Sequence, residues 1–202
     1  MSDSAFVPGE TPIDVSGLKL IRISTRAELN RAEAENIRKA VVKYLAAKPS
    51  SRTAPFTLSW AKKLHKQMLG DVWKWAGEFR QENLNLGCDW HQVQMQLQSL
   101  LEDLAFWEAN GDDLFEQAVR LHHRSVRIHP FPNGNGRWAR MLANIWLKRH
   151  GHSICEWPDE AIGSNSVIRA EYLEAIRGAD MGDEKPLLEL QRRFTHRRET
   201  LS

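Results

Sequence analysis

The segment IHPFPNGNGRWAR, residues 128–140, gathers side chains that could act together on a phosphate group. His129 is a candidate base, because an unperturbed imidazole titrates near neutrality and can accept a proton from an attacking hydroxyl. Gly134 and Gly136 flank Asn135, and residues without a Cβ let the backbone approach a ligand closely. The order of these residues favours proton removal beside a bound anion.

Two arginines and a phenylalanine strengthen this interpretation. We expect a helix to begin near Arg137, and a helix N-terminus offers unpaired N–H groups and the positive end of the helix dipole. Arg137 and Arg140 project from one side of that first turn, where their charges oppose the dipole and repel each other, so a bound di- or triphosphate explains them best. Phe131 would anchor the loop in the core. A glycine turn or a lone histidine is often only structural, and it is their combination that indicates a site.

Helical periodicity predicts the elements that must hold this segment. Thr25 and Glu28 have the spacing of a capping box, which predicts a helix from there to about Ala47. Apolar spacing predicts further helices near 58–70, 93–104, 114–128 and 137–146, with two more before the C-terminal end. Short mixed runs with a glycine predict a small β-hairpin at 80–91. We therefore expect an all-α fold with one hairpin.

Composition narrows the class of protein. The 202 residues, 42% hydrophobic and 27% charged, suit one ordinary globular domain. A formal net charge of +2 is too mild to indicate nucleic-acid binding. The start MSDSAFVPGE lacks the regions of a signal peptide, and no stretch approaches the roughly eighteen apolar residues of a membrane helix. Cys88 and Cys155 match no metal spacing and suit a reducing compartment. We expect a cytoplasmic protein without a membrane segment.

The segment HPFPNGNGRWAR resembles the signature of Fic-domain proteins, H-P-F-x-D/E-G-N-G-R-x-x-R, with Asn133 at the acidic position. The similarity extends through LHHRSVRIHPF and DVWKWAGEFR, and the order of the segments is most similar to the bacterial subgroup called mobile mystery protein B. The resemblance implies a Fic-type helical bundle. It divides the chain into an N-terminal arm (1–20), an N-terminal helix that is an inhibition candidate (21–48) and a Fic domain (49–202).

The resemblance also implies an activity, the transfer of AMP from ATP to a Ser, Thr or Tyr hydroxyl of a target protein. His129 would be the general base. The nucleotide would be bound by the rest of the motif, with Arg137 and Arg140 on the leaving pyrophosphate and a phosphate cradle formed by Gly134, Asn135 and Gly136, beside Phe131 and Asn133. Two alternatives stay open: transfer of the γ-phosphate from ATP bound in the opposite orientation, and a nucleotide-binding regulatory or toxin-like module with little turnover.

Asn133 departs from the motif at the position that normally orients Mg²⁺. An amide oxygen can ligate Mg²⁺ but carries no charge, so we expect weaker metal binding than in proteins with the acidic residue. Because catalysis here depends on neutralising phosphate charge, we also expect slower turnover.

The hairpin expected at 80–91 lies where Fic proteins carry a flap. An exposed strand edge can hold an extended target segment by main-chain pairing. Leu86 and Trp90 would provide side-chain pockets for the target, and Arg80 would brace the flap. A plain surface hairpin without a binding role is the alternative.

Many Fic proteins are restrained by a helix that carries the pattern S/T-x-x-x-E-G/N, whose glutamate pairs with the second motif arginine. The segment RAEAEN (31–36) resembles this pattern at Glu35, although Arg31 stands in place of the hydroxyl residue. The helical wheel instead favours Glu33, which shares a face with the apolar residues of the helix. We hypothesise that one of the two occupies Arg140 and blocks the γ-phosphate. Ordinary solvated glutamates are the alternative.

Overall fold

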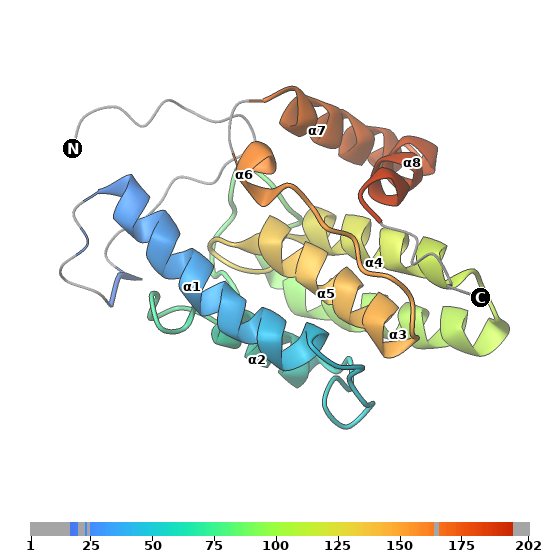
Figure 1. Cartoon of the computed structure of the whole chain (residues 1–202), viewed down its shortest axis with the longest axis horizontal. Helices are drawn as coiled ribbons and strands as arrows, with labels where there is room; N and C mark the ends of the chain where they lie inside the picture. The colour runs from blue at the N-terminus through green and yellow to red at the C-terminus, as the bar shows by residue number, and fades with distance from the viewer. Residues whose placement is uncertain (1–16, 20–22, 24, 164–165, 196–202) are drawn as a thin grey trace.

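The computed structural model of the chain describes residues 17–19, 23, 25–163 and 166–195, so most of the predicted arm at 1–20 lies outside the described residues. Within this part the regular elements are helical, as predicted (Figure 1). The α-helices are α1 (Arg26–Leu45), α2 (Leu58–Leu69), α3 (Val93–Asn110), α4 (Leu114–Ile128), α5 (Asn135–Arg149), α6 (Asp159–Ile162), α7 (Val167–Asp180) and α8 (Lys185–Arg193).

Side-chain caps start α1, α2 and α4. Thr25 Oγ1 accepts a hydrogen bond from Glu28 N, and the Glu28 carboxylate accepts one from Thr25 N, so the predicted capping box is confirmed. Thr57 caps α2 and Asp113 caps α4 through side-chain oxygens. α4 ends at Ile128, and its C-cap His129 has a left-handed backbone with φ of 53° that turns the chain toward α5.

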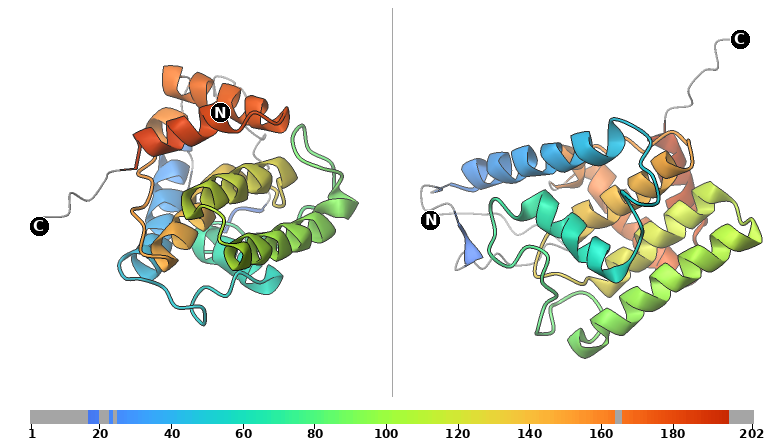
Figure 2. Two further views of the ribbon diagram at one scale, coloured as in Figure 1. Left: turned by 90° about the vertical axis from the view of Figure 1, so that its right-hand side faces the viewer. Right: turned by 90° about the horizontal axis from the view of Figure 1, so that it is seen from below.

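An antiparallel pair of helices, α4 and α5, forms the centre of the molecule (Figures 1 and 2). α1 and α2 pack beside α5, and α3 runs along α4. The main hydrophobic core is formed by residues of the helices α1 through α5 and their connecting loops. Its largest fully buried side chains include Trp73, Trp138, Trp146 and Phe131. Full burial of a large apolar side chain contributes roughly 1.5–3 kcal/mol. A second hydrophobic cluster packs α7 and α8 against α4, so the central pair is supported from both sides.

The hairpin predicted at 80–91 is wrong, because these residues form an irregular loop followed by one turn of 3-10 helix. The backbone groups of residues 80–91 do not pair with each other as in a strand ladder. Arg80 N and Cys88 N donate to carbonyls on either side of His129, and the Arg80 guanidinium donates to the carbonyls of Glu82 and Cys88. A strand ladder would require these same carbonyls, so the arginine replaces it.

The described helices contain none with the length and apolar character needed to cross a bilayer.

Candidate functional site

Phe131 anchors the loop 129–134 that joins α4 to α5. Its side chain is fully buried, stacks on His65 of α2 with 3.7 Å between ring centroids, and meets Trp138 of α5 edge-on at 5.1 Å. Aromatic pairs of this kind contribute about 0.5–1.5 kcal/mol beyond their area burial. Phe131 therefore ties the loop to two helices at once.

Asn135, the first residue of α5, closes the same loop with its side chain. Oδ1 accepts a hydrogen bond from Phe131 N at 2.8 Å, and Nδ2 donates one to Phe131 O at 2.7 Å. Gly134 has φ of 78°, and a Cβ there would lie 2.4 Å from Leu69 Cδ1, so the position requires glycine. The amide of Asn135 shapes the loop, which leaves any phosphate cradle to the backbone of residues 134–136.

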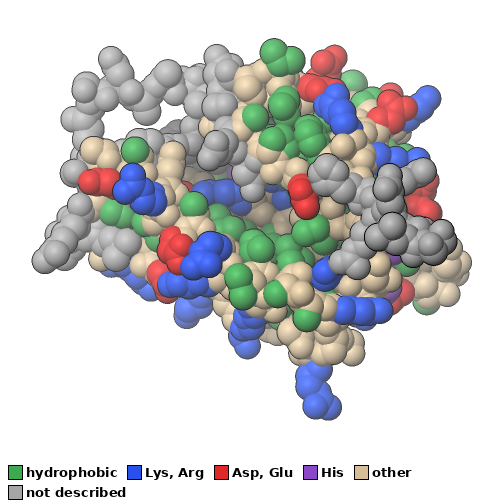
Figure 3. Space-filling model, in the orientation of Figure 1, with side chains coloured by type: hydrophobic (Ala, Val, Ile, Leu, Met, Phe, Trp, Pro, Cys, Tyr) green, Lys and Arg blue, Asp and Glu red, His purple; other side chains and the backbone are tan. Residues whose placement is uncertain are grey.

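The start of α5 concentrates positive charge beside this loop. The N–H groups of a first helical turn lack intrahelical acceptors and carry the positive end of the dipole. Arg140 is buried, with Nη1 3.4 Å from where a Cβ at Gly136 would lie, and Arg137 is partly exposed. On this face of the molecule, Lys and Arg side chains lie in a recess between α1 and α7 (Figure 3). The arrangement suits a polyanion.

His129 caps α4 at the other end of the loop and is largely buried. Its Nδ1 faces Val126 O at 3.4 Å, which favours a proton on Nδ1 and a lone pair on Nε2. Burial, and to a lesser extent the charge of Arg80, lowers the pKa of His129 to about 4. The ring is therefore neutral at pH 7, which is the form that accepts a proton from a hydroxyl.

The irregular loop that replaces the hairpin lies against His129. Arg80 is buried and its Nε donates to His129 O at 2.7 Å. Gly87 has φ of 103°, and a Cβ there would lie 2.6 Å from His129 Cβ, so the loop crosses directly over the histidine. Leu86 is exposed next to this crossing, and Trp90 stacks on the ring of the following residue at 3.7 Å.

Glu33 and Glu35, the two inhibition candidates, have opposite surroundings. The Glu33 side chain is 7% exposed, and its carboxylate accepts hydrogen bonds from Arg137 Nη1 at 2.8 Å and from Trp73 Nε1 at 2.7 Å. Glu35 is 54% exposed and bonds an arginine of its own helix. The glutamate that reaches the site is the one favoured by the helical wheel. Its arginine partner is Arg137, where the hypothesis named Arg140.

Asn133 is the side chain that the resemblance offers to Mg²⁺. Its Oδ1 accepts a hydrogen bond from Gly134 N. No three His, Cys, Asp or Glu side chains gather as a metal site in the part of the chain that the structure describes. The donor set is thus one neutral oxygen, and Mg²⁺ in such a set depends mainly on the phosphate oxygens of a nucleotide. The residues present fit a weakly held metal that arrives with its nucleotide.

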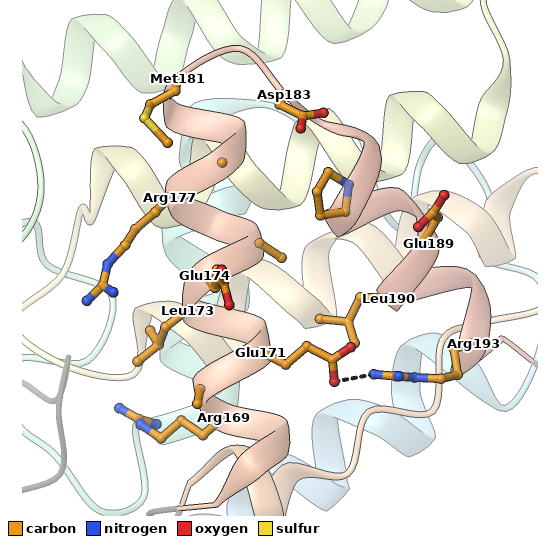
Figure 4. Close-up of a pocket in the computed structure, with 14 residues that line it drawn as sticks. Arg169, Glu171, Leu173, Glu174, Arg177, Met181, Asp183, Glu189, Leu190 and Arg193 are labelled. Atoms are coloured by element: carbon orange, nitrogen blue, oxygen red, sulfur yellow. Dashed lines mark hydrogen bonds and ion pairs between the residues drawn. The ribbon is translucent and has the colours of Figure 1, made fainter.

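A separate cavity of about 1000 Å³ opens between α7 and α8 (Figure 4). Glu171 of α7 and Arg193 of α8 face each other across it and form an ion pair at 2.6 Å. Its walls carry charges of both signs, and it contains no residue of the 128–140 segment. The cavity therefore lies apart from the candidate site and lacks the concentrated positive charge of α5.

Two further residues contact the site and are not among those that the sequence predicts, His65 and Trp73. His65 Nε2 lies 3.0 Å from Asn133 O, and the Trp73 indole holds Glu33. A histidine placed on the apolar stripe of a predicted helix was an available signal for His65. No signal in the sequence pairs Trp73 with Glu33, because the two are 40 positions apart.

The part of the chain that holds the candidate site is similar to known proteins. Residues 55–147 match the model of the Fic/DOC family. Protein adenylyltransferase fic-1 of Caenorhabditis elegans is 29% identical over 130 residues, which are 62% of this chain and 24% of that protein. Protein adenylyltransferase Fic of Aedes aegypti is 29% identical over 155 residues, 74% of this chain and 30% of that protein. The chain thus spans less than a third of the length of these relatives.

Solved structures share the fold. Fic-1 from C. elegans superimposes with a TM-score of 0.71 at 24% identity, covering 87% of this chain and 51% of that chain. The BepC protein of Bartonella tribocorum, solved with bound AMPPNP, gives a TM-score of 0.64 at 18% identity and covers 96% of both chains. At these identities the likeness establishes the helical fold.

Proposed function

We propose that the protein is an adenylyltransferase that transfers AMP from ATP to a Ser, Thr or Tyr hydroxyl of a target protein, because residues 55–147 match the model of the Fic/DOC family. The observation that carries the proposal is the placement of His129 and the arginine-flanked start of α5 at the two ends of one anchored loop. The names of the relatives and the nucleotide analogue bound by BepC support ATP as the substrate.

In the proposed reaction His129 Nε2 takes the proton of the target hydroxyl. The hydroxyl oxygen attacks the α-phosphorus, and the bond from that phosphorus to the bridging oxygen of the β-phosphate breaks, so AMP is attached to the target and pyrophosphate leaves. Arg137, Arg140 and the N–H groups of the first turn of α5 neutralise the charge that develops on the pyrophosphate. The negative phosphates beside His129 would raise its pKa from the low value set by burial, which strengthens the base when substrate is present.

Mg²⁺ would be held by the phosphates and by Asn133 Oδ1, and when bound it would supply positive charge to the α- and β-phosphates. Asn133→Asp tests this assignment, because a carboxylate can keep the bond to Gly134 N and adds a charge. We expect the Mg²⁺ concentration for half-maximal labelling to fall by about tenfold or more. An unchanged Mg²⁺ requirement would show that residue 133 does not contact the metal.

Intact-mass spectrometry after incubation with ATP and Mg²⁺ tests the activity itself, with the protein as its own acceptor. An AMP adduct that is absent from His129→Ala would establish both the reaction and its base. A phosphate adduct would instead establish γ-phosphate transfer. Absence of any adduct, also when Glu33 is replaced by Gln, would refute transfer to the chain itself.

A second candidate function is a nucleotide-binding regulatory or toxin-like module with little turnover. Two observations favour it: the neutral side chain of Asn133 at the proposed metal position, and the Glu33–Arg137 ion pair at the proposed anion site. This function predicts ATP binding by calorimetry without labelling in the wild type and in Asn133→Asp alike.

We also propose that Glu33 restrains nucleotide binding and that the loop carrying Leu86 and Trp90 receives the target segment.

A cytoplasmic location is supported by the two cysteines, Cys88 and Cys155, which are thiols and not a disulfide. Placement in the bacterial mobile mystery protein B subgroup depends on the order of sequence segments alone. The adenylyltransferases of C. elegans and Aedes aegypti are animal proteins and lend that placement no support.

A further inference from the structure

His65 lies in the middle of α2, fully buried, and both of its ring nitrogens have partners. Gly77 N donates to Nδ1 at 2.9 Å, and Nε2 lies 3.0 Å from Asn133 O. A backbone N–H can only donate and a carbonyl can only accept, so the ring proton must be on Nε2. Because Nδ1 accepts a hydrogen bond from a backbone N–H, the ring is in its neutral form in this structure.

The imidazole lies against three residues of the loop 129–134, namely Phe131, Asn133 and Gly134. Its ring stacks on Phe131 at an interplanar angle of 11°, its Nε2 bonds Asn133 O, and the same nitrogen lies 3.4 Å from where a Cβ at Gly134 would be. The contact at Gly77 joins the ring to the segment that continues into Arg80, which in turn bonds the backbone of the base.

The bond to Asn133 O fixes one peptide plane of the loop. In a trans peptide the carbonyl and the following N–H point in opposite directions. Because Asn133 O points to His65, Gly134 N–H points away from it, and that N–H is the group that holds Asn133 Oδ1. The orientation of the imidazole therefore determines on which side of the loop the side chain of residue 133 lies.

We propose that His65 is a positioning residue that fixes the peptide between Asn133 and Gly134, and so places the metal-position side chain and the phosphate-facing backbone. The inference rests on the proposed nucleotide function. His65 is fully buried and acts through the loop alone.

Two substitutions separate this role from simple packing. His65→Phe keeps a ring that can stack on Phe131 but removes both hydrogen bonds, whereas His65→Gln keeps one donor and one acceptor. We expect His65→Phe to weaken ATP binding by about tenfold or more and to raise KM for ATP with a smaller change in kcat. His65→Gln should recover most of that loss. His123→Phe is the matched control, because His123 is also buried in a hydrogen bond, to Asp180, but does not contact the loop.

Calorimetry with ATP, thermal unfolding and ¹⁵N NMR are measured on all four proteins. The expected result is a shifted Gly134 amide resonance in His65→Phe, a lower melting temperature in both Phe variants, and weaker ATP binding in His65→Phe only. Equal loss of affinity in His65→Phe and His123→Phe, or an unmoved Gly134 resonance, would overturn the proposal. If the wild type itself binds no ATP, the nucleotide function fails. The Gly134 resonance and the protonated nitrogen of His65 then still decide whether His65 sets the loop.

Discussion

Replacing Glu33 by Gln is expected to strengthen ATP binding, because the wild-type carboxylate holds an arginine that the nucleotide needs. In the free protein Glu33 Oε2 bonds Arg137 Nη1 at 2.8 Å, and Oε1 bonds Trp73 Nε1 at 2.7 Å. Glutamine has nearly the same shape and keeps an acceptor for the indole. The substitution therefore removes the charge of the pair and little else.

The magnitude follows from what the nucleotide must displace. A hydrogen bond that involves a charged group contributes about 1.5–3 kcal/mol, and the Glu33 side chain is too buried for water to screen it fully. Arg137 is partly exposed, so water recovers part of this when the pair opens, and the lower end of the range applies. A gain of about 1.5 kcal/mol corresponds to roughly tenfold tighter binding.

Isothermal titration of ATP into the wild type, Glu33→Gln and Glu35→Gln measures the effect. Glu35→Gln is the matched control, since it makes the same change on the same helix in a surface pair with little energetic weight. We expect about tenfold tighter binding for Glu33→Gln and no change for Glu35→Gln. Equal affinities of the wild type and Glu33→Gln for ATP would refute the restraint. Tighter binding by Glu35→Gln would show that Glu35, and not Glu33, restrains the nucleotide.

Further predictions concern pH, the loop and the base. Burial lowers the pKa of His122 to about 3, while the unfolded chain takes up that proton near pH 6.5, so the free energy of unfolding should fall as pH drops. Denaturant titrations at pH 7.5 and pH 5 should show about 2 kcal/mol less pH dependence in His122→Gln than in the wild type, and equal dependence would contradict the buried neutral state. Asn135→Ala leaves the buried N–H and C=O of Phe131 without their hydrogen-bond partner and should lower the free energy of unfolding by about 2–4 kcal/mol in chemical denaturation. A decrease smaller than that of a surface substitution would argue against closure of the loop by Asn135. Gly87→Ala places a Cβ against His129 and should reduce labelling more than Gly111→Ala, which also puts a side chain at a positive φ but has open surroundings.

Much of the fold was predictable because it is local. The Thr25–Glu28 spacing and the apolar stripes predicted the principal helices, since a capping box and a period of 3.6 residues depend only on neighbouring positions. The wheel placed Glu33 toward the core for the same reason. Its partner depends on how α1 packs on α5, across 104 positions of sequence, and no local pattern distinguishes Arg137 from Arg140 as that partner.

The hairpin shows where local pattern fails. Residues 80–91 have the short mixed runs and the glycine that predicted a hairpin, but the guanidinium of Arg80 competes for the carbonyls that a ladder would use. That competition depends on the end of α4 lying beside residues 80–91, which is a tertiary contact that the local sequence does not show. The role of Asn135 could not be predicted either. The motif indicates that an asparagine is needed, but it does not indicate whether the side chain bonds a ligand or the preceding loop.

The closure of the loop by Asn135 has a thermodynamic consequence. The loop 129–134 is held in one conformation by Asn135, the first residue of α5, and by the buried ring of Phe131. A ligand therefore need not order the loop when it binds. Association then loses little backbone entropy at this point, and the affinity is determined by charge attraction and by the groups that must be displaced. Nucleotide binding should accordingly weaken with ionic strength and show only a small heat-capacity change from the loop, as for a rigid receptor rather than a folding one.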